Sequence, residues 1–158
     1  MTEKKEILRE LKEISSKVTE LISKLEKEEK EKEMILEGRY EQNETIEKEL
    51  ESILSQLGAS KKSKGYQYII RAVLICLKDP SFLNGGVTTR LYPKIAEEFG
   101  TNPHNIDHAI QYQIQIIFQK DNLEIRKKLF PFNMRKPSNS NFIVSLAEYL
   151  SMSRHHQI

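Results

Sequence analysis

The chain has 158 residues, of which 30% are charged and 38% hydrophobic, and its formal net charge is +2. This composition is typical of a globular or partly coiled-coil chain and excludes a disordered one. The one cysteine, Cys76, excludes an intramolecular disulfide and is expected to be a small buried hydrophobe in an intracellular protein. No apolar run approaches the ~20 residues of a membrane span, and the charged N-terminus indicates no secretion, so we expect a cytoplasmic protein without a membrane partner.

Charge is unevenly spread along the chain. Residues 1–44 hold 10 Lys+Arg and 13 Asp+Glu, whereas residues 45–158 hold 15 and 10, together with all 4 histidines. The second part has the mild basic bias that a polyanion-binding module needs, although many other domains share it. We therefore expect two parts, a charged segment with its linker over 1–44 and a separate domain over 45–158.

Residues 3–37 predict one long amphipathic helix. Its apolar residues alternate spacings of four and three, which is a heptad seam with Leu11, Val18 and Leu25 at a and Ile7, Ile14 and Leu21 at d. After Leu25 the seam weakens, because Glu28 and Lys32 fall on core positions. One helix cannot bury this seam alone, so we expect self-association; a solvated, fraying helix is the alternative. Isoleucine at d does not favour a simple parallel dimer, and the stoichiometry stays open.

The rest of the chain predicts an all-α domain of about six helices. A break is expected at Gly38-Arg39-Tyr40, and the next helix should end at Gly58 as its C-cap. GYQYIIRAVLICLKD predicts a buried, central helix after the basic loop at 61–64. The helix TTRLYPKIAEEF is expected to be capped by Thr88 or Thr89, and the last helix, FIVSLAEYLSM, by Ser140 or Asn141.

Residues 95–110, IAEEFGTNPHNIDHAI, have the pattern of a helix-turn-helix. Ala96 is small where two helices cross, Gly100 can take the positive φ of the turn, and Ile106 faces the core. Asn102 can cap the second helix, and Pro103 suits its first turn. Recognition helices contact base edges near their N-terminus. The residues expected to face out and read bases here are His104, Asn105, Asp107, His108 and Gln111, with Tyr112 beside them.

Four blocks of sequence occur in order: LESILSQLGA, KGYQYIIRAV, LYPKIAEEF and RKPSNSNF. Together they resemble the C-terminal effector domain of the sporulation master regulator, stage zero sporulation protein A, over about residues 46–152. The resemblance implies a six-helix DNA-binding domain that reads a short promoter element in bacterial transcription control, in endospore-forming Firmicutes. The heptad helix stands where the family has its phosphoacceptor receiver domain, so phosphorylation-driven dimerisation is not carried over.

The reading face departs from the pattern that the resemblance implies. The family has arginines at the positions of Asn105, His108 and Gln111, a glutamate at Asp107 and a histidine at Tyr112. Amides can pair with adenine, a carboxylate can accept from cytosine N4 and histidine can donate to guanine, so base reading remains possible with a changed preference. Phosphate contacts are then expected from the surroundings: Tyr112, Thr89, Arg90, Lys94, Lys61, Lys62, Lys64, Arg135, Lys136, Ser138 and Asn139, with Lys120, Arg126, Lys127 and Lys128 as further candidates.

Two functions from different classes remain open. The first is a sequence-specific transcription regulator that binds double-stranded DNA, forms a homo-oligomer through its N-terminal helix and contacts RNA polymerase or a partner regulator. The second is an interaction protein or antagonist with the same fold that binds a partner regulator and has little DNA binding. The chain has no P-loop and no HExxH, so we expect no enzyme and no cofactor. His155 and His156 lack a third ligand of convincing spacing, so no metal site is expected.

Overall fold

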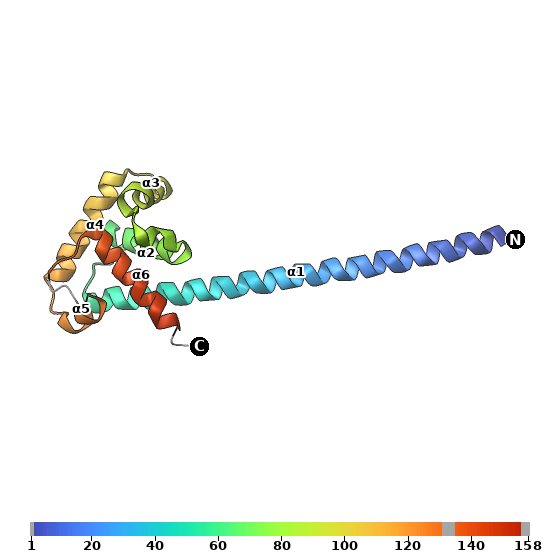
Figure 1. The fold of residues 1–158 in the computed structure, drawn as a ribbon, viewed down its shortest axis with the longest axis horizontal. Helices are drawn as coiled ribbons and strands as arrows, with labels where there is room; N and C mark the ends of the chain where they lie inside the picture. The colour runs from blue at the N-terminus through green and yellow to red at the C-terminus, as the bar shows by residue number, and fades with distance from the viewer. Residues whose placement is uncertain (1, 131–134, 156–158) are drawn as a thin grey trace. The chain divides into compact units, whose positions relative to one another are not determined.

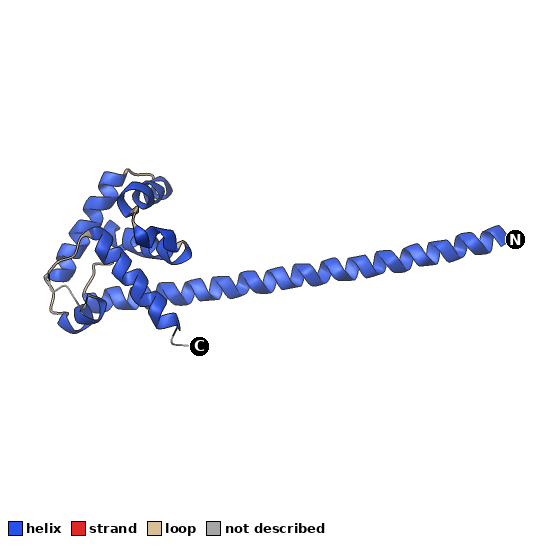
Figure 2. Ribbon diagram, viewed as in Figure 1, coloured by secondary structure: helices blue, strands red, loops and turns tan. Residues whose placement is uncertain are grey.

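The computed structural model describes residues 2–130 and 135–155, so His156 lies outside the described part. Within that part the chain is helical and contains no strand, which confirms the predicted all-α class (Figures 1 and 2). The α-helices are α1 (Thr2–Leu57), α2 (Lys64–Lys78), α3 (Tyr92–Phe99), α4 (Pro103–Phe118), α5 (Leu123–Leu129) and α6 (Asn139–His155). A 3-10 helix, η1 (Pro80–Asn84), and a π-helical turn, η2 (Val87–Leu91), connect α2 to α3.

Helix α1 is continuous, so the break predicted at Gly38-Arg39-Tyr40 is wrong. One glycine inside a helix costs only about 1 kcal/mol relative to alanine, and the residues around Gly38 are mostly good helix formers. The chain divides into two compact units, Met1–Glu44 and Thr45–Ile158, and the division falls inside α1. The last turns of α1 therefore serve as the first helix of the second unit.

In the first unit the heptad seam is uncovered. The six residues at its a and d positions are each between 48% and 60% exposed in the single chain: Ile7, Leu11, Ile14, Val18, Leu21 and Leu25. Burial of such side chains is worth about 1.5–3 kcal/mol each, so the isolated helix leaves this stabilisation unused.

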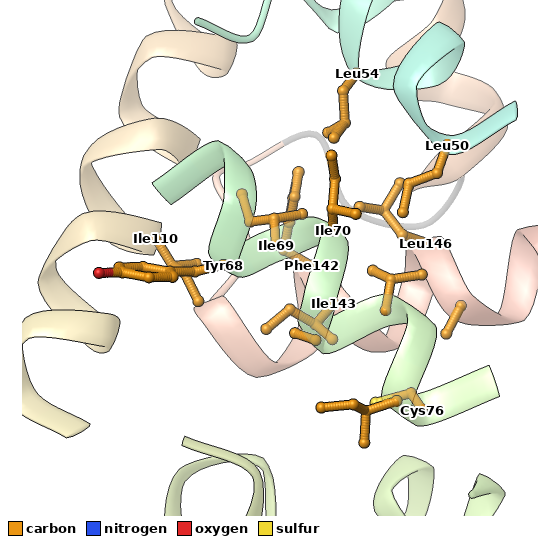
Figure 3. Close-up of a cluster of buried hydrophobic side chains, with 14 of the residues drawn as sticks. Leu50, Leu54, Tyr68, Ile69, Ile70, Cys76, Ile110, Phe142, Ile143 and Leu146 are labelled. Carbon is orange, nitrogen blue, oxygen red and sulfur yellow. The ribbon is translucent and has the colours of Figure 1, made fainter. Parts of the chain in front are cut away.

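The core of the second unit is built around α2, which packs against α4 and α6 as the predicted central helix. Leu50 and Leu54 of α1 reach the same cluster as Ile70 of α2 and Leu146 of α6 (Figure 3). Cys76 is fully buried in this cluster, and burial raises the pKa of its thiol to about 11. The cysteine is thus an inert core residue, as its aliphatic neighbours predicted.

Outside α4, the helix ends confirm one predicted cap and correct two. Gly58 has φ 83° and follows the last residue of α1, as expected of a C-cap. Thr88 and Thr89 do not cap α3, because they lie in the π-helical turn η2. Pro93 has no backbone N–H to donate to a preceding α-helical turn, and it lies in the first turn of α3. Helix α6 begins before Ser140 and Asn141, and Ser138 caps it: its Oγ accepts from the backbone N of Asn141 at 3.2 Å.

The start of α2 lies unusually close to the middle of α4. A Cβ added to Gly65 would be 2.2 Å from the carbonyl oxygen of Ala109, far inside contact distance. Next to this contact, the fully buried Gln113 of α4 donates from Nε2 to the carbonyl oxygen of Ser60 at 3.1 Å. Gly65 and Gln113 together set the position of α4 against the rest of the unit.

Replacing Gly65 with alanine should destabilise the second unit by about 1–3 kcal/mol, since the new methyl group can only be accommodated by moving one helix backbone away from another. Urea unfolding of the full chain measures this change. Gly38→Ala is the matched control, because Gly38 is also helical but has nothing within 4 Å of an added Cβ. An unchanged urea midpoint for Gly65→Ala would show that the helices do not need this close approach.

Candidate nucleic-acid interface

Helices α3 and α4 and the turn between them form the predicted helix-turn-helix. Gly100 is left-handed, with φ 64°, and Ala96 is buried where the helices meet. The side chain of Asn102 caps α4 by accepting from the backbone N of Asn105 at 2.9 Å, and Pro103 opens the helix. Ile106 is completely buried. The structural roles expected of these residues are therefore confirmed.

An ion pair fixes α3 on α2. Arg71 donates from Nε to Oε2 of Glu98 at 2.6 Å and from Nη2 to Oε1 at 2.9 Å, which is a bidentate arrangement. The two side chains are 36% and 33% exposed, so water screens the pair only in part. Hydrogen bonds from Arg71 hold the pKa of the Glu98 carboxyl below its usual value. This pair orients the first helix of the motif.

The start of α4 presents a polar surface without lysine or arginine. His104, Asn105, His108 and Gln111 are exposed, and so is Tyr112. The rings of His104 and His108 lie edge to face with centroids 4.3 Å apart, and Nδ2 of Asn105 donates to Oγ1 of Thr101 at 3.0 Å. These contacts restrict the side chains while leaving donors and acceptors open to a ligand.

Asp107 differs from the other expected base-reading residues because it is half-buried and already bonded. Asn139, at the start of α6, donates from Nδ2 to the backbone oxygen of Asp107 at 3.0 Å and to its Oδ1 at 2.9 Å. One carboxylate oxygen is thus committed to holding α6 against α4. Asn139 in turn has its amide group engaged, which restricts the phosphate contact expected of it.

Two hollows contain expected contact residues, and one of them borders α4. One, of about 500 Å³, is lined by Lys64 from the start of α2 together with Asn105, His108 and Tyr112 of α4. The structure therefore brings Lys64 and Tyr112, two expected phosphate contacts, beside two expected base-reading residues.

The second hollow, of about 360 Å³, lies between η2 and the start of α6. It is lined by Thr88 and Thr89 on one side and by Ser140 and Asn141 on the other. Thr89, an expected phosphate contact, thus lies close to the capped end of α6, where Ser138 is exposed. Segments far apart in the sequence meet here, and they bring hydroxyl and amide groups together at a helix start.

The basic residues expected to hold phosphate are distributed over several elements. Lys61, Lys62, Lys94, Arg135 and Lys136 are exposed. Arg90 is also exposed, but its guanidinium lies 4.5 Å from the ring centroid of Phe82 and is partly committed to that contact.

The basic residues of α5 are not gathered at the start of α4. The guanidinium of Arg126 lies 4.9 Å from the ring centroid of Phe118, the last residue of α4. Helix α4 has 16 residues and a length of about 24 Å. Lys120 and Lys127 also come after the end of α4 in the sequence. These basic residues therefore lie away from the expected base-reading residues at the start of α4.

Two buried polar residues hold α4 and have no part in the expected site. Gln113 lies on the buried stripe of Ile106, Ile110 and Ile117. The spacing of four, three and four residues along this stripe is the pattern in the sequence that indicates an inward-facing Gln113. Asn122 has no such signal: its Nδ2 donates to the backbone oxygens of Ile117, at 2.8 Å, and of Leu57. Asn122 thereby ties the end of α4 to the end of α1.

Other kinds of site receive no support from the described part of the chain. No three of its histidine, cysteine, aspartate and glutamate side chains are grouped as metal ligands would be. None of its helices is both long enough and apolar enough to cross a membrane.

An all-α unit in which a glycine turn joins α3 to a capped helix with a polar outer face has the helix-turn-helix arrangement. Residues 50–150 match the family described as Sporulation initiation factor Spo0A C terminal. The match covers more than half of the chain, and the protein belongs to this family, as the four sequence blocks predicted. It is a family of DNA-binding regulatory domains and not of enzymes.

Asn139→Ala should destabilise the second unit by about 1–3 kcal/mol, because it leaves two half-buried acceptors of Asp107 without their donor. Urea unfolding measures the loss. Asn141→Ala is the matched control, since Asn141 is exposed in the same turn and should change stability by less than about 0.5 kcal/mol. Equal effects of the two substitutions would contradict the role assigned to Asn139.

The Arg71–Glu98 pair should make stability depend on pH. Because the folded-state pKa of Glu98 is lowered, its contribution is present above the pKa of an unfolded glutamate and is lost as pH falls through the lowered value. Glu98→Gln should therefore be less stable than the parent at neutral pH and approach it in acid. Unfolding midpoints across an acid pH series test this, with the exposed Glu97→Gln as control.

Proposed function

We propose that this protein is a sequence-specific DNA-binding transcription regulator that reads DNA with the start of α4. The observation that carries the proposal is the exposed row of imidazole and amide side chains on a capped helix, in a family of DNA-binding regulatory domains. The N-terminal part of such a helix enters the major groove in helix-turn-helix proteins. His104, Asn105, His108 and Gln111 are the proposed base-reading residues, together with the free carboxylate oxygen of Asp107.

The chemistry of this face implies a preference different from that of an arginine face. Asn105 and Gln111 suit the N6 and N7 atoms of adenine, whereas the two histidines suit guanine acceptors. Asp107 keeps one carboxylate oxygen for the amino group of cytosine, since Asn139 occupies the other. Without positive charge the helix releases fewer counterions, so it contributes less salt-dependent affinity.

Phosphate contacts on both sides of α4 would supply that affinity. On one side we assign Lys64 and Tyr112, which share a hollow with Asn105. On the other we assign Thr89 and Ser138, with backbone N–H groups at the start of α6 completing a place for a phosphate oxygen. The remaining candidates are Lys61, Lys62, Arg90, Lys94, Arg135 and Lys136, with the amide of Asn139 limited by its bonds to Asp107.

Self-association through the first 44 residues is part of the proposal. Two linked domains on paired DNA sites bind as one unit, and the second contact forms at high effective concentration. This gain offsets the affinity lost with the arginines. A regulator arranged in this way would then act on RNA polymerase or on a partner regulator.

The second candidate is an interaction protein or antagonist with the same fold. The uncharged reading face favours it, because a domain that has given up DNA no longer needs arginine there. It would bind a partner regulator through the exposed α1 seam or through the domain surface. The two candidates differ in whether DNA binding shows sequence preference and salt dependence.

Selection from a random double-stranded DNA library, with the full chain at low salt, should enrich one motif. Asn105→Ala and Gln111→Ala should each lower the affinity for that motif by about 1–3 kcal/mol and relax preference at one position. Lys64→Ala should weaken all sequences equally and reduce the salt slope by about one. Gln119→Ala is the matched amide control, since Gln119 is exposed at the C-cap of α4, at the opposite end of the helix from the proposed reading face.

Absence of an enriched motif, together with weak binding that is insensitive to salt, would overturn the regulator and support the interaction protein. A motif that survives Asn105→Ala and Gln111→Ala unchanged would keep DNA binding but remove α4 as the reading helix.

A further inference from the structure

The apolar surface of α1 is wider than its heptad seam. Leu8 and Ile22 lie at e positions on either side of Ser15, are 54% and 49% exposed and lie beside the seam residues. A seam of a and d positions alone is typical of a two-stranded coiled coil, whereas apolar residues at a, d and e are typical of helices in a bundle. A two-stranded coil would leave the e-position residues in water.

The identity of the core residues does not by itself decide the number of strands. In parallel coiled coils, leucine at a with isoleucine at d, as at Leu11 and Ile14, shifts the preference towards trimers and tetramers. Valine at a with leucine at d, as at Val18 and Leu21, favours two strands. The width of the apolar stripe therefore carries the case for more than two strands.

The charged residues at the ends of the seam decide between parallel and antiparallel packing. Glu28 falls on a d position, and Lys4 and Lys32 fall on a positions. A parallel bundle in register would place each of these against its own copies, so like charges would meet within the core layers. An antiparallel arrangement avoids this.

When Ile14 faces Val18 of an antiparallel neighbour, every seam residue finds an apolar partner. Ile7 then faces Leu25, and Leu11 faces Leu21. The same register continues to the end of the seam, where Lys4 faces Glu28, so opposite charges close both ends of the apolar segment. One register thus satisfies the six seam residues and the two charged positions that follow.

The two flanks of the helix differ in the same register. On the e side, Leu8 meets Ile22 of the neighbour, and this contact is apolar. On the g side, Glu10 meets Lys24, which is an attractive pair. The central residue of each flank, Ser15 on the e side and Lys17 on the g side, meets its own copy. The e flank and the g flank differ, and each pairs with the same flank of an antiparallel helix. One helix can therefore have two antiparallel neighbours, one at each flank.

We propose that four copies of this chain assemble through residues 4–28 into an antiparallel four-helix bundle. The inference rests on the self-association proposed above and adds the number of chains and the relative orientation of their helices. The bundle would be about 37 Å long at 1.5 Å per residue. Two chains continue from each end towards their DNA-binding domains, so one assembly would offer those domains as two pairs.

Sedimentation equilibrium of the full chain measures the order of assembly. The expected mass is that of four chains. A mass of two or three chains would overturn this inference and leave self-association standing, whereas a single chain at all concentrations would remove self-association itself. Neither result bears on whether the domain reads DNA, which the library selection tests separately.

A charge exchange measures the orientation. Lys4→Glu or Glu28→Lys alone should raise the protein concentration needed for half-assembly by about tenfold, because like charges then meet in the end layers. The double variant should restore assembly. In a parallel bundle, residues 4 and 28 each meet their own copies, so like charges meet in the end layers of every variant. If the double variant does not recover assembly, the antiparallel orientation is overturned. Glu26→Lys, at an outward position, is the matched control.

Discussion

The contact between Gly65 of α2 and the backbone of Ala109 in α4 is the constraint on which the domain depends. It allows no side chain at the glycine, so two helix backbones meet directly where the central helix begins. Gln113 locks the same region through a buried hydrogen bond to Ser60. Since α4 is held by its middle, its first two turns enter the core on one face only, through Ile106 and Ile110, and can carry polar side chains outward on the other. The proposed reading face is therefore a consequence of where the helices touch.

Around that contact, α4, the proposed reading helix, is positioned by groups from distant segments. The Arg71–Glu98 pair holds the helix before it, Asn139 holds Asp107 from the far side, and Asn122 ties its end to α1. Each of these uses a charged or amide group that would otherwise be available to a ligand. Each contact that makes the site more rigid therefore leaves fewer polar groups available to bind a ligand. A face with amides and imidazoles in place of arginine gains from this rigidity, because short side chains lose little freedom when they meet a base.

The N-terminal helix complements the domain in energetic terms. A reading face with little positive charge binds DNA weakly by itself, since counterion release supplies much of the affinity of such proteins. A helix with an uncovered apolar stripe is equally incomplete as a single chain. Association of several copies would resolve both, because it buries the stripe and links several weak readers into one binding unit.

Local patterns in the sequence determined the helices, the glycine turn with its Asn102 cap, the inward stripe of α4 and the uncovered heptad seam. Each depends on residues within a few positions of one another, so periodicity and capping rules describe them. The predicted break at Gly38 failed because the cost of one glycine is small beside the helix preference of its neighbours. Tertiary structure decided the rest: that Gln113 is bonded to Ser60, that Asp107 is bonded to Asn139, and that Thr89 lies near the start of α6. These contacts join segments far apart in the chain, and only the packing of whole helices against each other brings those segments together.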